Sequence, residues 1–206
     1  GGGSNDAGQM VPFGGARPVL GTNPIAVGVP TGDDAPFVID FATSVVAGGK
    51  ILVAESENAE LPPGAIVDKE GNPSVDPADY SNGGALLPVG GHKGYALALF
   101  SALLGGLTGD YDAARQSMNG LFMQVIDIAS FTPLEQYRRN VRAFLDFVKA
   151  TPPAPGFEEV IVPGDYEQSN RVSRTAAGIE LPEDVCTKIA AWAGKLNVQI
   201  EGPVTG

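Results

Sequence analysis

The pattern of apolar and polar positions predicts strands in the N-terminal part of the chain. Residues 25–29 alternate between β-branched and small side chains, which is the period of a strand. The continuous apolar run Phe37-Val38-Ile39 predicts a second strand, buried on both faces. Residues 45–60 are compatible with a helix, although Gly48-Gly49 weakens that prediction.

The amino-acid composition changes twice in the middle of the chain. Between residues 61 and 90, Pro and Gly recur with Asp and Asn, which predicts a long surface loop with at most a turn or two of regular structure. Gly90-Gly91-His92-Lys93-Gly94 then leads into Tyr95–Leu107, where almost every residue is apolar or small. A helix that is apolar on all sides is buried, so we expect this stretch to form the core, with Leu99 and Leu103 inside it.

The region after this helix predicts a loop, a strand and an amphipathic helix. Asp110–Asn119 is polar and loop-like, and the β-branched residues of Leu121–Ile128 favour a strand. Thr132, Pro133 and Glu135 form a helix start with a capping box. This helix is expected to bury one stripe and to expose an arginine face, formed respectively by Leu134, Tyr137, Val141, Phe144, Leu145 and Val148, and by Arg138, Arg139 and Arg142.

Two further elements are predicted toward the C-terminus. Residues 157–162 are expected to form a short strand that ends at the turn Pro163-Gly164-Asp165. The sequence Leu181-Pro182-Glu183-Asp184 opens a last helix, with acidic residues in its first turn. Cys186 is expected to be a buried thiol of that helix. The rest of its buried side comprises Val185, Ile189, Trp192 and Leu196.

Composition excludes several classes of protein. The 206 residues include 13 Lys and Arg against 24 Asp and Glu, a net charge of −11 that argues against a nucleic-acid partner. The single Cys and single His exclude a disulfide scaffold and multi-histidine zinc chemistry, so no metal site is expected. No apolar stretch reaches the ~18 residues needed to span a bilayer, so we expect a cytoplasmic protein without a membrane partner. The opening Gly1-Gly2-Gly3-Ser4 fits either an engineered linker or a natural Gly-rich loop.

The segment from Gly90 to Gly94 carries the most informative candidate chemistry. Its glycines free the backbone, and Lys93 adds a positive charge where a helix begins. Exposed N–H groups at a helix N-terminus attract anions, so a phosphate or a carboxylate is the expected guest. The segment matches neither a Walker A loop nor a GxGxxG turn. A Gly-rich turn with a solvated lysine and a capping histidine remains the equally weighted alternative.

Three other positions allow both a structural and a functional interpretation. Asp40 ends a buried strand, where a carboxylate either holds a ribose hydroxyl or accepts hydrogen bonds from the following turn. Thr22-Asn23-Pro24 is either a simple turn or a binding point for a small polar ligand beside Gly21. Gly164 follows a predicted strand and allows close approach of a ligand to the backbone.

Six short blocks follow one another in a fixed order along the chain. They are Pro12-Phe13-Gly14-Gly15, residues 20–26, Ile39-Asp40-Phe41-Ala42-Thr43-Ser44, the Pro- and Gly-rich residues 61–77, Leu86-Leu87-Pro88, and residues 90–95. Together they resemble the malate/L-lactate dehydrogenase family of NAD(P)-dependent 2-hydroxyacid oxidoreductases, which lack a Rossmann fold. The family includes ureidoglycolate, sulfolactate and diketogulonate-type enzymes and cyclic-imine reductases. The resemblance extends from Pro12 to Leu196, nearly the whole chain.

The resemblance implies a fold and an activity. The fold is α/β, with a mixed, largely antiparallel central sheet, flanking helices and a non-Rossmann way of binding the dinucleotide. The activity is hydride transfer between NAD or NADP and C2 of a small 2-oxo or 2-hydroxy acid. The NAD(P)-binding domain is expected over residues 10–165. A C-terminal helical segment, residues 166–206, is expected to pack on an N-terminal part that this chain lacks.

The resemblance also implies the site residues. Three segments look like cofactor contacts, namely Asp40-Phe41-Ala42-Thr43-Ser44, His92-Lys93-Gly94 and Pro163-Gly164-Asp165. Thr22 resembles a residue that faces the substrate. Family members usually carry Glu where Asp165 stands, which is a conservative departure.

One departure from the family is large. Family members begin with a helical region that supplies a catalytic histidine and an arginine for the substrate carboxylate, and nothing before Pro12 matches it. His92 lies in the cofactor turn, so the resemblance implies no catalytic residue in this chain. A second copy in an intertwined homodimer or a missing N-terminal polypeptide is expected to complete the enzyme. The alternative is a non-catalytic nucleotide-binding or structural module with the same phosphate cradle.

Overall fold

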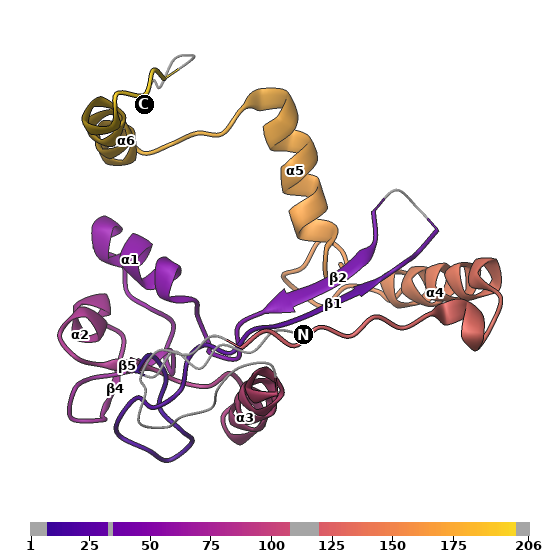
Figure 1. Ribbon diagram of the computed structural model, residues 1–206, viewed down its shortest axis with the longest axis horizontal. Helices are drawn as coiled ribbons and strands as arrows, with labels where there is room; N and C mark the ends of the chain where they lie inside the picture. Colours follow the sequence, from indigo (N-terminus) through magenta and orange to yellow (C-terminus); the bar gives the residue numbers. More distant parts are fainter. Residues whose placement is uncertain (1–7, 33–34, 108–119, 201–206) are drawn as a thin grey trace. The chain divides into compact units, whose positions relative to one another are not determined.

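The computed structural model describes residues 8–32, 35–107 and 120–200, which form a series of short strands and six helices (Figure 1). The chain divides into two compact units, Gly1–Ala150 and Thr151–Gly206, and each is described here by itself. The predicted domain boundary after Asp165 lies inside the second unit and stays a prediction.

The first two strands form an antiparallel ribbon. β1 (Ile25–Val29) pairs with β2 (Phe37–Phe41), as Figure 1 shows. In this pairing, Val27 lies opposite Ile39. Both predicted strands are confirmed. The prediction that the second is buried on both faces is wrong, because Phe37 and Ile39 are half-buried whereas the residues between and after them are exposed. The ribbon therefore has one packed face and one open face, as antiparallel sheets commonly do.

The region predicted as a loop forms the second sheet instead. β3 (Ile66–Val67) lies between β4 (Pro73–Ser74) and β5 (Ala85–Leu86), and both pairs are antiparallel. The short helix α2 (Pro77–Ser81) begins at Asp76, whose carboxylate accepts the Ala78 N–H at 2.9 Å. The loop prediction for residues 61–90 is wrong because the turns dense in Pro and Gly connect strands of two residues each, which pair with one another.

The core of the first unit surrounds this small sheet. Met10 forms backbone bridges to both Leu20 and Leu86, which draws the N-terminal residues into the sheet. α1 (Gly48–Glu57) confirms the predicted helix and contributes the buried Ile51. The buried cluster comprises Met10, Leu20, Ile51, Leu61, Ala65, Ile66, Leu86 and Ala98.

The apolar stretch after Gly91 is a helix, as predicted, but it is not buried in the way that was predicted. α3 (His92–Gly106) buries small residues, namely Gly94, Ala98, Ser101, Ala102 and Gly105. Phe100 is 57% exposed and Leu103 is 65% exposed, and Leu99 is also exposed, so the expectation of a helix buried on all sides is wrong. A stripe of small residues lets the backbone of a helix approach its neighbours closely. The large side chains consequently lie on the opposite face.

The region after α3 differs from the sequence predictions in two places. The loop predicted for Asp110–Asn119 lies outside the described residues. The strand predicted for Leu121–Ile128 is wrong, because residues 120–127 have no regular structure, Val125 is 87% exposed, and a 3₁₀ turn, η1, follows at Ile128–Ser130. Extended residues become a strand only when another strand pairs with them, and none of the described strands does so.

The long helix α4 (Leu134–Lys149) confirms the predicted helix but not its cap. Pro133 occupies the N-cap position, and Glu135 accepts a hydrogen bond from the Arg138 guanidinium at 2.7 Å instead of completing a capping box. Most of the predicted stripe is half-buried, whereas Phe144 is exposed. Arg138 lies on the half-buried side, against Gly32, and not on the solvent face predicted for it.

The second unit contains α5 (Asp165–Ala177), which the sequence analysis did not predict, and the predicted last helix α6 (Glu183–Leu196). The strand predicted for residues 157–162 is wrong, because these residues have no regular structure. Cys186 is buried as predicted, but Trp192 is 61% exposed, so the expected buried side of α6 is wrong. Among the described residues of this unit, Cys186 is the one buried apolar side chain. No described helix of the chain is long and apolar enough to cross a membrane.

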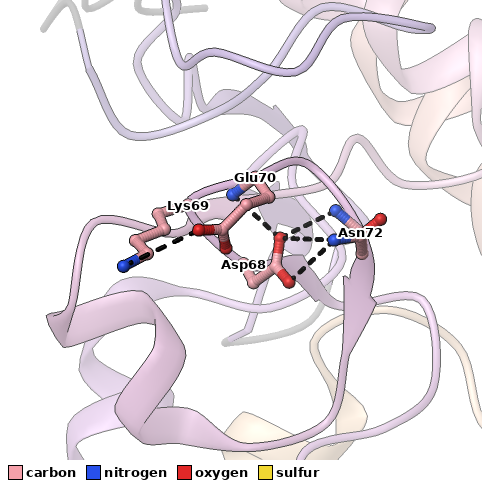
Figure 2. A network of polar contacts seen from close by, with 4 residues as sticks. All are labelled: Asp68, Lys69, Glu70 and Asn72. Atoms are coloured by element: carbon pink, nitrogen blue, oxygen red, sulfur yellow. Dashed lines mark hydrogen bonds and ion pairs between the residues drawn. The ribbon is translucent and has the colours of Figure 1, made fainter.

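The turn from β3 to β4 is closed by a network around Asp68 (Figure 2). One carboxylate oxygen of Asp68 accepts the backbone N–H groups of Glu70 at 3.0 Å and Asn72 at 2.8 Å. The other oxygen accepts the Asn72 side-chain amide at 3.1 Å, and Lys69 pairs with Glu70 at the surface. Donors aimed at the ionised carboxylate, above all the side chain and backbone of Asn72, lower the pKa of Asp68 from 3.8.

The burial pattern predicts which leucines stabilise the first unit. Leu86→Ala should cost about 2–5 kcal/mol, because it opens a cavity in a fully buried site. Leu103→Ala, the matched control on the exposed face of α3, should cost less than about 1 kcal/mol. Urea melts of the two variants measure both values. Equal losses would show that the exposed face of α3 is covered in solution.

The Asp68 network predicts a pH-dependent contribution to stability. Because the folded-state pKa lies below 3.8, the stabilisation is present above that pH and is lost as the pH falls through the folded-state value. Asp68→Asn should therefore lower the free energy of unfolding at pH 7, and the difference from wild type should shrink below pH 3.8. Chemical denaturation across this range measures the difference. A difference that does not vary with pH would contradict the role of the ionised carboxylate.

Candidate functional site

The start of α3 is an exposed, basic turn built on two glycines. Gly90 and Gly91 adopt the left-handed conformation, with φ values of +59° and +63°, and Gly91 is the N-cap of the helix. His92 and Lys93, both predicted site residues, are exposed immediately after it. The ring of Phe13 meets the His92 ring edge-on, with centroids 5.9 Å apart. Phe13 could not be placed at this turn from the sequence, because only the fold brings it there.

Gly94 shows why this turn tolerates no side chain at its base. It is buried, and a Cβ added there would lie 2.0 Å from the carbonyl oxygen of Val89. The backbone at Gly94 therefore packs directly onto the backbone of Val89, at the beginning of the same turn. The first N–H groups of a helix have no carbonyl partner within the helix, and that of Lys93 makes only a long contact of 3.4 Å to the Gly90 carbonyl. These donors and the Lys93 charge together favour an anion.

The predicted cofactor segment 40–44 is exposed at its beginning and buried at its end. Asp40 and Phe41 are exposed as they complete β2, and Ala42 is half-buried. Thr43 and Ser44 are buried, and Ser44 forms an antiparallel bridge with Pro88. The exposed carboxylate of Asp40 is open to a ligand, whereas the two hydroxyls are used within the protein.

Thr43 joins the predicted substrate residue to the turn. Its backbone N–H and its hydroxyl both donate to the carbonyl oxygen of Thr22, at 2.9 and 2.8 Å. Its own carbonyl accepts the N–H of Val89 at 2.9 Å. The structure thus brings together three stretches that lie far apart in the sequence, namely Thr22, residues 43–44 and residues 88–94.

Asn23 has a structural role beside this junction. Its side chain is fully buried, and its amide donates to the carbonyl of Ala98 on α3 at 3.0 Å. The Ser101 hydroxyl on the same helix donates to the Pro24 carbonyl at 3.2 Å. Residues 22–24 were expected to form either a simple turn or a binding point for a small polar ligand. Asn23 fits the structural interpretation, whereas Thr22 is half-buried and partly accessible.

The turn Pro163-Gly164-Asp165 belongs to the second unit. Gly164 has a φ of +99° and is the N-cap of α5. One carboxylate oxygen of Asp165 accepts the N–H of Val162 at 3.1 Å, so this side chain closes its own turn. The predicted cofactor contacts of residues 163–165 stay a prediction. Among the described residues, no group of three or more His, Cys, Asp or Glu side chains is placed to hold a metal ion.

Comparison with known proteins identifies the family. The model of the malate/L-lactate dehydrogenase family matches residues 3–190. The chain therefore belongs to this family, as the ordered sequence blocks predicted. The predicted mixed α/β class with antiparallel strands and flanking helices is also confirmed.

Three relatives illustrate the extent of the match. The malate/(S)-sulfolactate dehydrogenase of Methanothermus fervidus is 36% identical over 96% of this chain, and the L-lactate dehydrogenase of Cupriavidus necator is 34% identical over 95%. The solved sulfolactate dehydrogenase of Methanocaldococcus jannaschii has 33% identity over 96% of this chain, with a TM-score of 0.77. The chain spans 59% of the length of each of these three proteins.

The close approach at Gly94 predicts opposite effects for two glycine substitutions. Gly94→Ala should destabilise the protein by about 1–3 kcal/mol, because the new methyl group overlaps the Val89 carbonyl. Gly49→Ala, in the first turn of α1 with open space around its Cβ, should be neutral or stabilise by up to about 1 kcal/mol. Thermal or urea unfolding compares the two. Stabilisation by both substitutions would contradict the tight packing of the turn.

Proposed function

We propose that this chain supplies the dinucleotide-binding part of an NAD(P)-dependent 2-hydroxyacid oxidoreductase. The observation that carries the proposal is the turn at residues 90–94, where a left-handed glycine pair, an exposed lysine and the first N–H groups of α3 coincide. Family membership and relatives named as malate, sulfolactate and lactate dehydrogenases support the same class.

The residues of the turn fit the phosphates of a nicotinamide dinucleotide. A pyrophosphate accepts hydrogen bonds from backbone N–H groups and pairs with a cation, and the turn offers both on its exposed side. Gly94 keeps the backbone free of side chain at the base of this cradle. His92 borders the same surface, with its ring oriented by Phe13. We propose His92, Lys93 and Gly94 as cofactor contacts on these grounds.

Asp40 and its neighbours are proposed as the second set of cofactor contacts. Asp40 is an exposed carboxylate at the carboxyl end of β2, where it is able to accept hydrogen bonds from ribose hydroxyls. Phe41 and Ala42 follow it on the accessible part of the segment. The turn at residues 163–165 is proposed as a third contact, with Gly164 allowing close approach to the backbone. The proposal covers NAD and NADP alike.

Thr22 is proposed as the residue of this chain that faces the substrate. It is half-buried, and Thr43 fixes its backbone through two hydrogen bonds. The relatives are named as malate, sulfolactate and lactate dehydrogenases, which supports small 2-hydroxy acids and their 2-oxo counterparts as the proposed substrate class. The bound nicotinamide supplies the hydride donor or acceptor for C2 of such a substrate. The proposed task of this chain is to bind and orient the two reactants.

The rest of the activity is proposed to require polypeptide beyond the described units. The second unit leaves most of its apolar side chains exposed, as does the outer face of α3. We propose that residues 166–206 pack on an N-terminal part or on a second copy in a homodimer, which supplies the group that transfers the proton. No catalytic residue is assigned to this chain, and a cytoplasmic location stays a prediction.

The proposed function predicts the effect of removing the Lys93 charge. A hydrogen bond to a charged group contributes about 1.5–3 kcal/mol, so Lys93→Ala should weaken dinucleotide binding by roughly tenfold to a hundredfold. The loss should shrink at high salt because the contact is electrostatic and exposed. Fluorescence titration with NADH and with NADPH measures the affinities of both proteins.

Lys69→Ala is the matched control for this titration. Lys69 is also exposed, but it pairs with Glu70 in the β3–β4 turn. The control should bind the dinucleotides like wild type, and neither variant should be greatly destabilised. Failure of the wild-type chain to bind either dinucleotide, or equal affinities of wild type and Lys93→Ala at low salt, would overturn the proposed function.

A further inference from the structure

Thr43 closes a ring of contacts that contains both proposed binding segments. Its side chain and backbone hold the Thr22 carbonyl, and the adjacent Asn23 donates to Ala98 on α3. The first turn of that helix packs its Gly94 backbone onto Val89. The N–H of Val89 then returns to the Thr43 carbonyl and closes the ring. A change at one link therefore reaches both binding segments.

We infer that Thr43 is a positioning residue that sets the spacing between Thr22 and the anion-binding turn at residues 90–94. This inference rests on the proposed function for its significance, because the two segments are the proposed substrate and cofactor contacts. The resemblance to the family suggested that Thr43 touches the cofactor itself. A residue that is 0% exposed and whose hydroxyl already donates to Thr22 acts on the cofactor through its neighbours instead.

The hydroxyl of Thr43 is the specific part of this role. A carbonyl oxygen has two lone pairs, and the Thr22 oxygen accepts both the N–H and the hydroxyl of Thr43. The double contact fixes the orientation of the peptide that leads into Asn23. Asn23 has a φ of +38°, a conformation that needs external support in a residue other than glycine. Without the hydroxyl, one backbone hydrogen bond remains and the peptide is free to tilt.

Loss of a hydroxyl that fixes geometry affects binding, whereas loss of a contact that only stabilises the fold does not. Small displacements of groups that bind or orient reactants weaken binding even when the protein remains folded. Loss of the Thr43 hydroxyl should therefore loosen residues 21–24 and 88–94 together and weaken dinucleotide binding. A stabilising contact elsewhere should change the global stability alone.

Three variants of the full chain separate these cases. Thr43→Val removes the hydroxyl and keeps the shape, and Thr43→Ser keeps the hydroxyl and removes a methyl group. Thr31→Val is the matched control, because Thr31 is also buried and its hydroxyl donates to a backbone carbonyl, that of Ala35, at 2.9 Å. Amide hydrogen exchange of peptides covering residues 21–24 and 88–94 reports how often the backbone hydrogen bonds of the two segments open, and NADH and NADPH titrations report binding.

In Thr43→Val, exchange in both peptides should become about two- to tenfold faster, and the affinity for the dinucleotide should fall by a similar factor, as expected from one neutral hydrogen bond. Thr43→Ser should match wild type in both measurements. Thr31→Val should leave both peptides and the affinity unchanged, even if its melting temperature falls.

Each outcome of these measurements either supports the inference or overturns it. Unchanged exchange at either segment in Thr43→Val overturns the inference, and so does a loss of affinity without faster exchange, which indicates direct contact with the dinucleotide. If Thr43→Val does not fold, weakened binding or faster exchange in Thr43→Ser overturns it, whereas wild-type behaviour of Thr43→Ser supports the hydroxyl role. If wild type binds neither dinucleotide, the proposed function fails, and the exchange data still decide whether Thr43 sets the spacing.

Discussion

The segment from Ala85 to Val89, which begins with the strand β5, is the constraint on which the first unit depends. Leu86 exchanges backbone hydrogen bonds with residues 9–11 on one edge, at 2.8 and 3.1 Å. Leu87 donates to the Ala65 carbonyl on the other edge at 2.9 Å. A strand bonded on both edges cannot shift without breaking both sets of bonds. It therefore fixes the point from which the next helix, α3, begins.

The position of the candidate site follows from this strand. Val89 is held by Thr43, and Gly94 lies so close to Val89 that a side chain has no room. The intervening glycines adopt left-handed conformations, which other residues reach only at a cost in free energy. The turn is thus held in shape before any ligand arrives, so less ordering entropy is lost on binding. Its rigidity derives from the strand, and its charge derives from Lys93.

The sequence predicts the elements of this protein better than their burial. Period-two alternation identified β1, and a run of apolar and small residues identified α3. Residues 61–90 were misassigned because strands of two residues, such as β3, are too short to show a period. The exposure of Leu103 was missed because hydrophobicity indicates that a face can be covered but not what covers it. Burial is a property of the packing partner as much as of the residue.

The sequence indicates only the local part of the candidate site, and its cofactor contacts stay a prediction. The Gly-rich turn before α3 is a local signal, and the exposed His92 and Lys93 lie where that signal placed them. The junction that fixes the turn is not local, because Thr43 and Thr22 are separated by 21 positions and Asn23 and Ala98 by 75. A buried threonine in a strand pattern gives no sign of which carbonyl its hydroxyl will reach.

The net negative charge of the chain makes the geometry of the turn at residues 90–94 more important for binding an anion. With a net charge of −11, the long-range field of the protein opposes the approach of an anionic dinucleotide. At physiological ionic strength that field is screened beyond about 8 Å, whereas the proposed hydrogen bonds from N–H groups and the proposed contact with Lys93 would act at shorter range. The site is therefore expected to gain its affinity from contacts and not from electrostatic steering. Because contacts depend on distance far more steeply than a long-range field does, the bonds that fix the spacing of Thr22, Thr43 and Val89 are expected to matter as much as the charge of Lys93.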